Sequence, residues 1–172
     1  MSIIKRKIRS IVRKNKFLFF LYYNVLVKYR IKKKRKIISK YGYDLLKDIH
    51  RILNQEKIKF FIDFGTLLGM IRDNGFIKYD LDIDIGVIGE SAEIVKKVKE
   101  HLINGGYIFK SQMIFKEKIV KQKFLYKQIK IDISYYEQGE TTSKCYLFYI
   151  DYEANIIHPK NYFSAVQMTY DK

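Results

Sequence analysis

Residues 81–87 alternate between apolar and acidic or small side chains, and this alternation limits the fold more than any other feature of the sequence. On an extended strand the apolar face would hold Leu81, Ile83, Ile85 and Val87, and the polar face would hold Asp80, Asp82, Asp84 and Gly86. Carboxylates two residues apart lie roughly 7 Å from each other along a strand, and they repel. Such a row persists most easily when a divalent cation neutralises it. Asp82 and Asp84 are therefore predicted to bind a metal ion, and the alternative is a solvated acidic edge strand.

The remaining periodicity predicts an α/β or α+β domain with a mixed sheet and flanking helices. Helices are expected over 44–57, 66–72 and 91–104, and Thr66 is expected to cap the second. Strands are expected over 58–64, 81–87, 107–111, 115–121, 123–136 and 145–152, with turns at 74–75 and 137–140. A length of 172 residues and an apolar content of 48% are sufficient for one such domain with a packed core.

The positive charge of the chain is concentrated at its N-terminus. Residues 1–40 contain 15 of the 34 Lys and Arg residues and none of the 18 Asp and Glu residues. The apolar run at 17–27 is too short to cross a bilayer, which takes about 20 residues. We therefore expect residues 1–40 to form a basic helical arm on an anionic membrane surface, and residues 41–172 to form the folded domain that carries the acidic row. A helix docked on the domain has the same pattern, and nucleic acid is a rival partner that is not favoured.

Two further segments carry residues that suit a phosphate-handling metal site. Gly65 and Thr66 follow a predicted strand and open a helix, where backbone amides can hold phosphate oxygens. Asp132 is the polar residue in the alternating segment 129–133, so a neighbouring strand could bring a third carboxylate to the same ions. A glycine turn before a helix, an Asp-x-Asp strand and a later strand with one Asp match the plan of the nucleotidyltransferase fold.

Other reactive residue types are interpreted as structural. Asp63 precedes the glycine turn, and Cys145 lies in an apolar strand where a single thiol cannot build a disulfide framework. The histidines share no ligand spacing with one another, and they are His50, His101 and His158.

The segment 65–85 closely resembles the signature of the LicD family, which includes bacterial phosphocholine transferases and is related to fukutin-type proteins. The family pattern is approximately G-T-L-L-G-x-x-R-x-x-G-F-I-P-W-D-D-D-I-D-I, and the resemblance extends over roughly residues 44–136. Three positions depart from it, since Lys78 replaces Pro, Tyr79 replaces Trp and Leu81 replaces Asp. Leu81 faces away from the acidic row, so the metal site is expected to persist, and the other two changes are expected to alter the substrate rather than the reaction.

The resemblance implies transfer of a substituted phosphate, such as phosphocholine or another phospho-alcohol, from a CDP-type donor to a sugar hydroxyl. The acceptor would be a cell-surface glycan or its lipid-linked precursor. The ligands of Mg²⁺ or Mn²⁺ would be Asp82, Asp84 and Asp132, and the substrate-binding residues would be Gly65, Thr66, Arg72 and Asp80. Asp132 would alternatively act as a base toward the acceptor, and Arg72 would bind phosphate or pair with Asp80.

Two other functions remain open. A different nucleotidyltransferase would attach a nucleotide to RNA, protein or a small molecule, although the long gap between Gly65 and Asp82 favours the LicD pattern. A non-catalytic, membrane-bound remnant is the other alternative, because family members usually continue past the point where this sequence stops. Nucleotide-activated donors and lipid-linked acceptors meet at the cytoplasmic face of a membrane, so we expect a peripheral protein of the inner face of the cell membrane.

Overall fold

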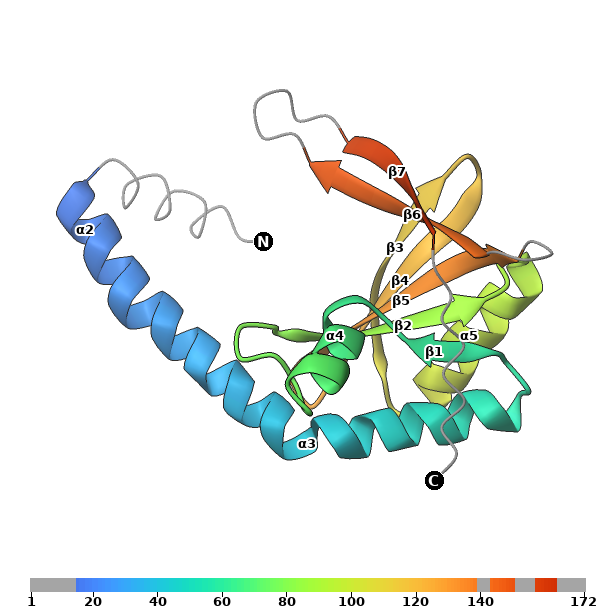
Figure 1. Cartoon of the computed structure of the whole chain (residues 1–172), viewed down its shortest axis with the longest axis horizontal. Helices are drawn as coiled ribbons and strands as arrows, with labels where there is room; N and C mark the ends of the chain where they lie inside the picture. The colour runs from blue at the N-terminus through green and yellow to red at the C-terminus, as the bar shows by residue number, and fades with distance from the viewer. Residues whose placement is uncertain (1–14, 139–142, 151–156, 164–172) are drawn as a thin grey trace.

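The computed structural model describes residues 15–138, 143–150 and 157–163, and at its centre is a mixed β-sheet covered by helices (Figure 1). Five strands lie in the order β1 (Phe60–Ile62), β2 (Asp82–Ile88), β5 (Ile129–Gln138), β4 (Lys118–Tyr126) and β3 (Ile108–Phe115). Strands β2 and β5 are parallel, and their other neighbours are antiparallel. A hairpin of β6 (Ser143–Ile150) and β7 (Ile157–Phe163) pairs with the end of β5. The predicted fold class is therefore confirmed.

Helices α3 (Lys28–Gln55) and α5 (Ala92–Asn104) bury the apolar face of this sheet. The apolar residues of β2 behave as the alternation predicts, because Ile83, Ile85 and Val87 are at most 1% exposed. Helix α5 begins at the predicted position, where the hydroxyl of Ser91 accepts a hydrogen bond from the amide of Ile94. The apolar face packs against the helices, so the acidic residues of β2 lie on the opposite face, beside the short helix α4 (Phe64–Arg72).

The chain is helical without interruption from Lys16 to Gln55, through α2 (Lys16–Leu21), the π-helical segment η1 (Tyr22–Val27) and α3. Figure 1 shows the N-terminal part of this helix extending away from the sheet. The core-facing part begins before residue 40, since Ile38 is 3% exposed and belongs to the core. No helix in the described part of the chain combines the length and apolar character needed to cross a membrane.

Three local predictions are wrong. Strand β3 continues through 112–114 to Phe115, so the break expected between the strands 107–111 and 115–121 lies instead at Lys116 and Glu117. The strand expected over 123–136 is two strands, β4 and β5, joined at Lys127 and Gln128. Both turn residues have positive φ values, 45° and 68°, as in the tight hairpin turns that usually carry Asn-Gly, so composition did not reveal the turn. The cap of α4 is Asp63 rather than Thr66, because the aspartate side chain accepts a hydrogen bond from the amide of Phe64. Residues 139–142 of the turn expected over 137–140, and the side chains of Cys145 and His158, lie outside the described set.

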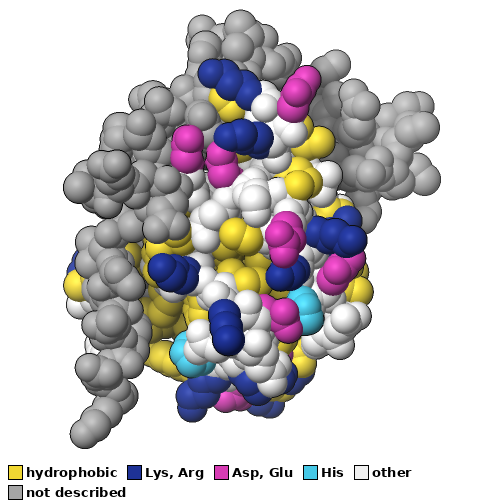
Figure 2. All heavy atoms as spheres, turned by 90° about the vertical axis from the view of Figure 1, so that its right-hand side faces the viewer, with side chains coloured by type: hydrophobic (Ala, Val, Ile, Leu, Met, Phe, Trp, Pro, Cys, Tyr) yellow, Lys and Arg dark blue, Asp and Glu magenta, His cyan; other side chains and the backbone are white. Residues whose placement is uncertain are grey.

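The domain surface away from the N-terminal helix carries charges of both signs. On the face turned to the viewer in Figure 2, basic and acidic side chains are interspersed, and neither forms a continuous patch. This fits the near balance of 19 basic and 18 acidic residues over 41–172. A concentration of positive charge is therefore a local property of the N-terminal segments.

Candidate metal site

Three carboxylates converge at the start of β2. Asp82 and Asp84 lie on the polar face of the strand, and Asp80 lies in the loop that leads into it. One carboxylate oxygen from each of the three lies within 4.8 Å of those of the other two, and all three residues are partly buried. Carboxylate oxygens are the ligands that Mg²⁺, Mn²⁺ and Ca²⁺ prefer. These residues could therefore hold a divalent cation.

The electrostatics of the acidic cluster (Asp80, Asp82 and Asp84) favour a bound cation. Burial, followed by the charge of Asp82, raises the pKa of Asp84 to about 7. Burial, followed by a hydrogen bond and the charge of Asp82, raises the pKa of Asp80 to about 6. Both groups thus hold protons that carboxylates in water lose near pH 4. A cation would displace those protons and stabilise the ionised carboxylates.

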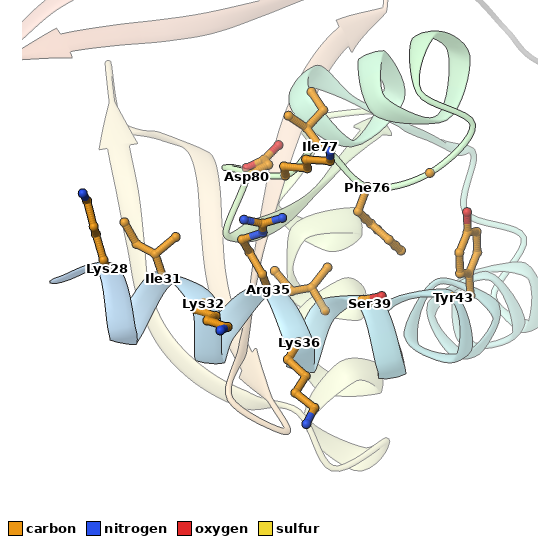
Figure 3. Close-up of a pocket in the computed structure, with 13 residues that line it drawn as sticks. Lys28, Ile31, Lys32, Arg35, Lys36, Ser39, Tyr43, Phe76, Ile77 and Asp80 are labelled. Carbon is orange, nitrogen blue, oxygen red and sulfur yellow. The ribbon is translucent and has the colours of Figure 1, made fainter. Parts of the chain in front are cut away.

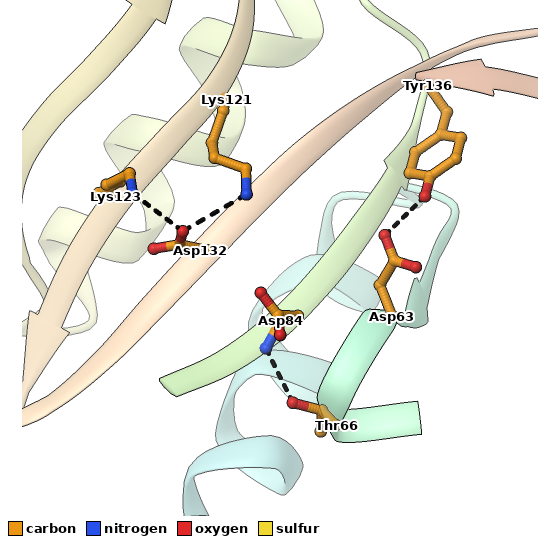
Figure 4. Close-up of polar contacts among 7 residues, drawn as sticks. All are labelled: Asp63, Thr66, Asp84, Lys121, Lys123, Asp132 and Tyr136. Carbon is orange, nitrogen blue, oxygen red and sulfur yellow. Dashed lines mark hydrogen bonds and ion pairs between the residues drawn. The ribbon is translucent and has the colours of Figure 1, made fainter. Parts of the chain in front are cut away.

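The first turn of α4 positions the acidic cluster. A Cβ atom on Gly65 would lie 1.9 Å from Oδ2 of Asp80, so only glycine leaves room for this carboxylate. The hydroxyl of Thr66, which is 1% exposed, accepts a hydrogen bond of 2.9 Å from the backbone amide of Asp84 (Figure 4). Gly65 and Thr66 therefore contact the backbone or side chains of the cluster, and their predicted contact with donor phosphate stays a prediction.

Asp63 anchors this turn from the other side. Its backbone amide donates to the carbonyl of Asp84 at 3.0 Å, and the hydroxyl of Tyr136 donates to its Oδ2 atom at 2.7 Å (Figure 4). Burial raises the pKa of Asp63, and its hydrogen bonds to Tyr136 and Phe64 oppose that rise. The contacts fit the structural interpretation of Asp63, which ties α4 to both β2 and β5.

Asp132 lies beside the cluster but has different partners. It pairs in register with Asp84 on the neighbouring parallel strand, and it is 7% exposed. Its Oδ2 atom lies 3.1 Å from the ammonium of Lys123 and 3.4 Å from that of Lys121, both on β4 (Figure 4). The carboxylate of Asp132 is not one of the three that converge within 4.8 Å. A role as third ligand or as base stays a prediction.

Lys121 and Lys123 were not predicted as site residues. Their only sequence signal is that they alternate with Val120, Gln122 and Phe124, which are all buried. The positive charge of Lys121 also lowers the pKa of Asp84, so it acts on the acidic cluster as well as on Asp132. Two ammonium groups therefore lie next to a candidate cation site on the same face of the sheet.

Arg72 does not pair with Asp80, and that alternative is wrong for this structure. Its Nε and Nη2 atoms each lie 2.7 Å from an oxygen of Asp73. The pair is exposed at the end of α4, where an ion pair contributes little to stability. Binding of phosphate by Arg72 stays a prediction.

A mixed sheet with an Asp-x-Asp strand, a parallel partner strand that carries one Asp, and a glycine-led helix beside them define a nucleotidyltransferase-type domain. The chain belongs to the LicD family, since residues 57–170 match the LicD/FKTN/FKRP nucleotidyltransferase domain. The matched description is that of a nucleotidyltransferase domain, in agreement with the arrangement of these strands and of the helix beside them.

Two curated relatives come from Rickettsia, and both are described as uncharacterized proteins. The chain is 35% identical over 88 residues to a protein of Rickettsia typhi, a match that covers 51% of this chain and 28% of the relative. It is 38% identical over 80 residues to a protein of Rickettsia prowazekii, a match that covers 46% of this chain and 29% of the relative. The matched segment is thus less than a third of either relative.

Proposed function

We propose that the protein transfers a substituted phosphate, such as phosphocholine or another phospho-alcohol, from a CDP-type donor to a sugar hydroxyl of a cell-surface glycan or its lipid-linked precursor. The observation that carries this proposal is the convergence of Asp80, Asp82 and Asp84 within 4.8 Å. The pKa values of Asp80 and Asp84 are raised, and a divalent ion such as Mg²⁺ or Mn²⁺ would stabilise the ionised forms of these carboxylates. When bound, that ion would polarise a phosphoryl oxygen and neutralise charge on the leaving phosphate.

In this reaction the acceptor oxygen forms a bond to the phosphorus atom of the substituted phosphate. The bond from that phosphorus to the nucleoside monophosphate breaks, and the monophosphate leaves with the electron pair. The hydroxyl proton passes to a carboxylate, for which Asp132 is the candidate because it lies beside the three convergent carboxylates without belonging to them. Lys121 and Lys123 would stabilise the phosphate oxygens as negative charge develops on them.

The test is release of nucleoside monophosphate from CDP-alcohols in the presence of a glycan acceptor, with and without Mg²⁺. Asp82→Asn and Asp84→Asn should each abolish Mg²⁺-dependent transfer while leaving the fold intact. Asp44→Asn is the matched control, because Asp44 is exposed on α3 and lies outside the acidic cluster. Normal Mg²⁺-dependent turnover in either cluster variant would overturn the assignment.

We further propose that the N-terminal helix associates with the inner face of an anionic cell membrane. Several of its described apolar side chains are exposed, with 71% of Phe17 and 64% of Phe20 accessible to solvent. Apolar side chains beside many cations suit the interface between lipid tails and anionic headgroups. Nucleic acid is the rival partner, and its binding should fall almost completely with salt.

Co-sedimentation with anionic vesicles across a salt series separates these two partners. Retention of the protein on the vesicles at high salt, lost when residues 1–27 are deleted, supports membrane association. The deletion should end at residue 27 because Ile38 belongs to the domain core. Tight RNA or DNA binding without vesicle binding would overturn the proposal.

A further inference from the structure

A cleft of about 810 Å³ separates the first half of α3 from the loop between α4 and β2 (Figure 3). Basic side chains line it from both sides, namely Lys28, Lys32, Arg35, Lys36 and Lys78. Asp80 is the one acidic residue among those that line it, and Asp80 also belongs to the acidic cluster. The cleft is therefore continuous with the candidate metal site.

Within residues 15–138, 143–150 and 157–163 the positive charge of this cleft is largely uncompensated, since Asp80 is the one carboxylate in its lining and only Lys78 acts on another, Asp73. None of its five basic residues forms an ion pair with a carboxylate in the described part of the chain. Basic residues elsewhere on the same helix do find partners, as Arg51 does with Asp48 at 2.6 Å. In Figure 3 the side chain of Arg35 extends from α3 toward the loop that carries Asp80. Low-dielectric walls focus the field of such charges on the space between them, which favours an anionic ligand.

Apolar side chains form the rest of the wall. Ile31, Phe76 and Ile77 line the cleft, and Ile77 is 7% exposed. At the end marked by Lys28, the cleft meets a helical segment with exposed apolar side chains, including Val25 at 54% and Tyr29 at 66% exposure. The ligand that suits these walls combines a phosphate with an apolar group.

We propose that this cleft binds the phosphate group of a substrate, with Lys32 and Arg35 as its main ligands and with the reacting end of the substrate directed toward Asp80. A guanidinium binds phosphate through two parallel hydrogen bonds, and an ammonium adds a point charge. Two sources supply such a phosphate: a lipid phosphate that carries the acceptor glycan and also brings the apolar group, and the diphosphate of the nucleotide donor. The inference rests on the proposed function only for the identity of the reaction at Asp80.

The experiment is calorimetric titration of the full chain, in EDTA and a non-ionic detergent, with geranyl phosphate and separately with CDP. The double variant Lys32→Gln/Arg35→Gln should weaken binding of at least one of these ligands by about tenfold or more, because it removes charge-assisted hydrogen bonds. Arg30→Gln/Lys33→Gln is the matched control. It removes one Arg and one Lys at the same spacing on the same helix, from residues that do not line the cleft.

The control pair should change affinity by no more than about twofold, as surface substitutions usually do. A loss confined to geranyl phosphate assigns the cleft to the lipid-linked acceptor, and a loss confined to CDP assigns it to the donor. If neither ligand binds, if both pairs weaken binding equally, or if neither pair affects it, the proposal is overturned. The titration contains no divalent ion and measures no turnover. The outcome of the titration therefore does not depend on whether the transferase assay succeeds.

Discussion

The carboxylate of Asp80 fills the space beside Gly65. A Cβ atom on any other residue at position 65 would lie 1.9 Å from Oδ2 of Asp80. Gly65→Ala should therefore expel Asp80 from the acidic cluster without altering a carboxylate. We expect Mn²⁺ affinity to fall by about 10- to 100-fold, as when a residue that supports metal ligands is lost. Calorimetric titration with Mn²⁺ measures this change. Gly75→Ala is the control, because its Cβ would meet nothing closer than the Tyr43 hydroxyl at 3.5 Å. Equal affinities in the two variants would contradict the steric argument.

The metal-free protein should lose stability as pH rises. Asp84 has a pKa of about 7 in the folded state and about 3.9 in the unfolded chain, so between these values the folded state binds more protons. The free energy of unfolding therefore falls with increasing pH across this window. Thermal denaturation in EDTA should give a lower Tm at pH 8 than at pH 5, with a smaller difference in Asp84→Asn. Added Mg²⁺ should raise the Tm of the unmutated protein at pH 8. A Tm in EDTA that stays level or rises with pH would refute the electrostatic description.

Lys121 should set the pH at which the metal binds. Its charge lowers the pKa of Asp84, so Lys121→Met should raise that pKa further. Because a cation must displace the proton, the midpoint of Mn²⁺ binding against pH should move upward by roughly one unit. Lys123→Met is the control, since Lys123 pairs with Asp132 but is not among the charges that shift Asp84. Midpoints that shift equally in both variants would show that Lys121 has no distinct effect.

The hydrogen bond from Tyr136 to Asp63 should contribute more to stability than the hydrogen bond from Tyr135 to Gln122. Tyr136→Phe removes a buried donor from a carboxylate, which costs about 1.5–3 kcal/mol for a charged partner. Tyr135→Phe removes a bond of 2.6 Å to the neutral side chain of Gln122, which costs about 0.5–1.5 kcal/mol. Urea denaturation in EDTA measures both. A larger loss of unfolding free energy in Tyr135→Phe than in Tyr136→Phe would mean that the hydrogen bond to Asp63 is not the stronger of the two.

The turn between β3 and β4 should become more stable with residues suited to positive φ. Lys116 and Glu117 have φ values of 46° and 64°, and both are exposed. Lys116→Asn/Glu117→Gly should raise the free energy of unfolding by about 1 kcal/mol, because the gain at positive φ exceeds the entropic cost of glycine. An unchanged or lower urea midpoint would contradict the turn geometry.

Features encoded in a short segment were predictable from the sequence. The alternation around Ile83 predicts β2, its buried face and the polar positions of Asp82 and Asp84. Ser91 marked the start of α5 in the same way, because a cap acts only on the adjacent turn.

Features that depend on pairing between segments were not predictable. The lysine partners of Asp132 come from β4, and their position depends on a register that pairs Lys123 with Asp132 and Lys121 with Ser134. The cleft likewise needs α3 and the loop around Asp80, which are far apart in the sequence. Helices were expected within 1–40 and over 44–57, but their continuity through α3 and the burial of Ile38 depend on packing against other segments.

The uninterrupted course of α3 restricts how this chain can change in length. The helix advances by about 100° per residue, so one inserted residue between Lys36 and Ile38 would rotate Arg35 by that angle relative to the core. The cations would then point away from the loop that carries Asp80, although every side chain would still be present. A substitution along this helix alters the contacts of one side chain. An insertion or deletion rotates every side chain that precedes it about the helix axis, relative to the core. For this segment, the number of residues is a stricter requirement than the identity of most of them.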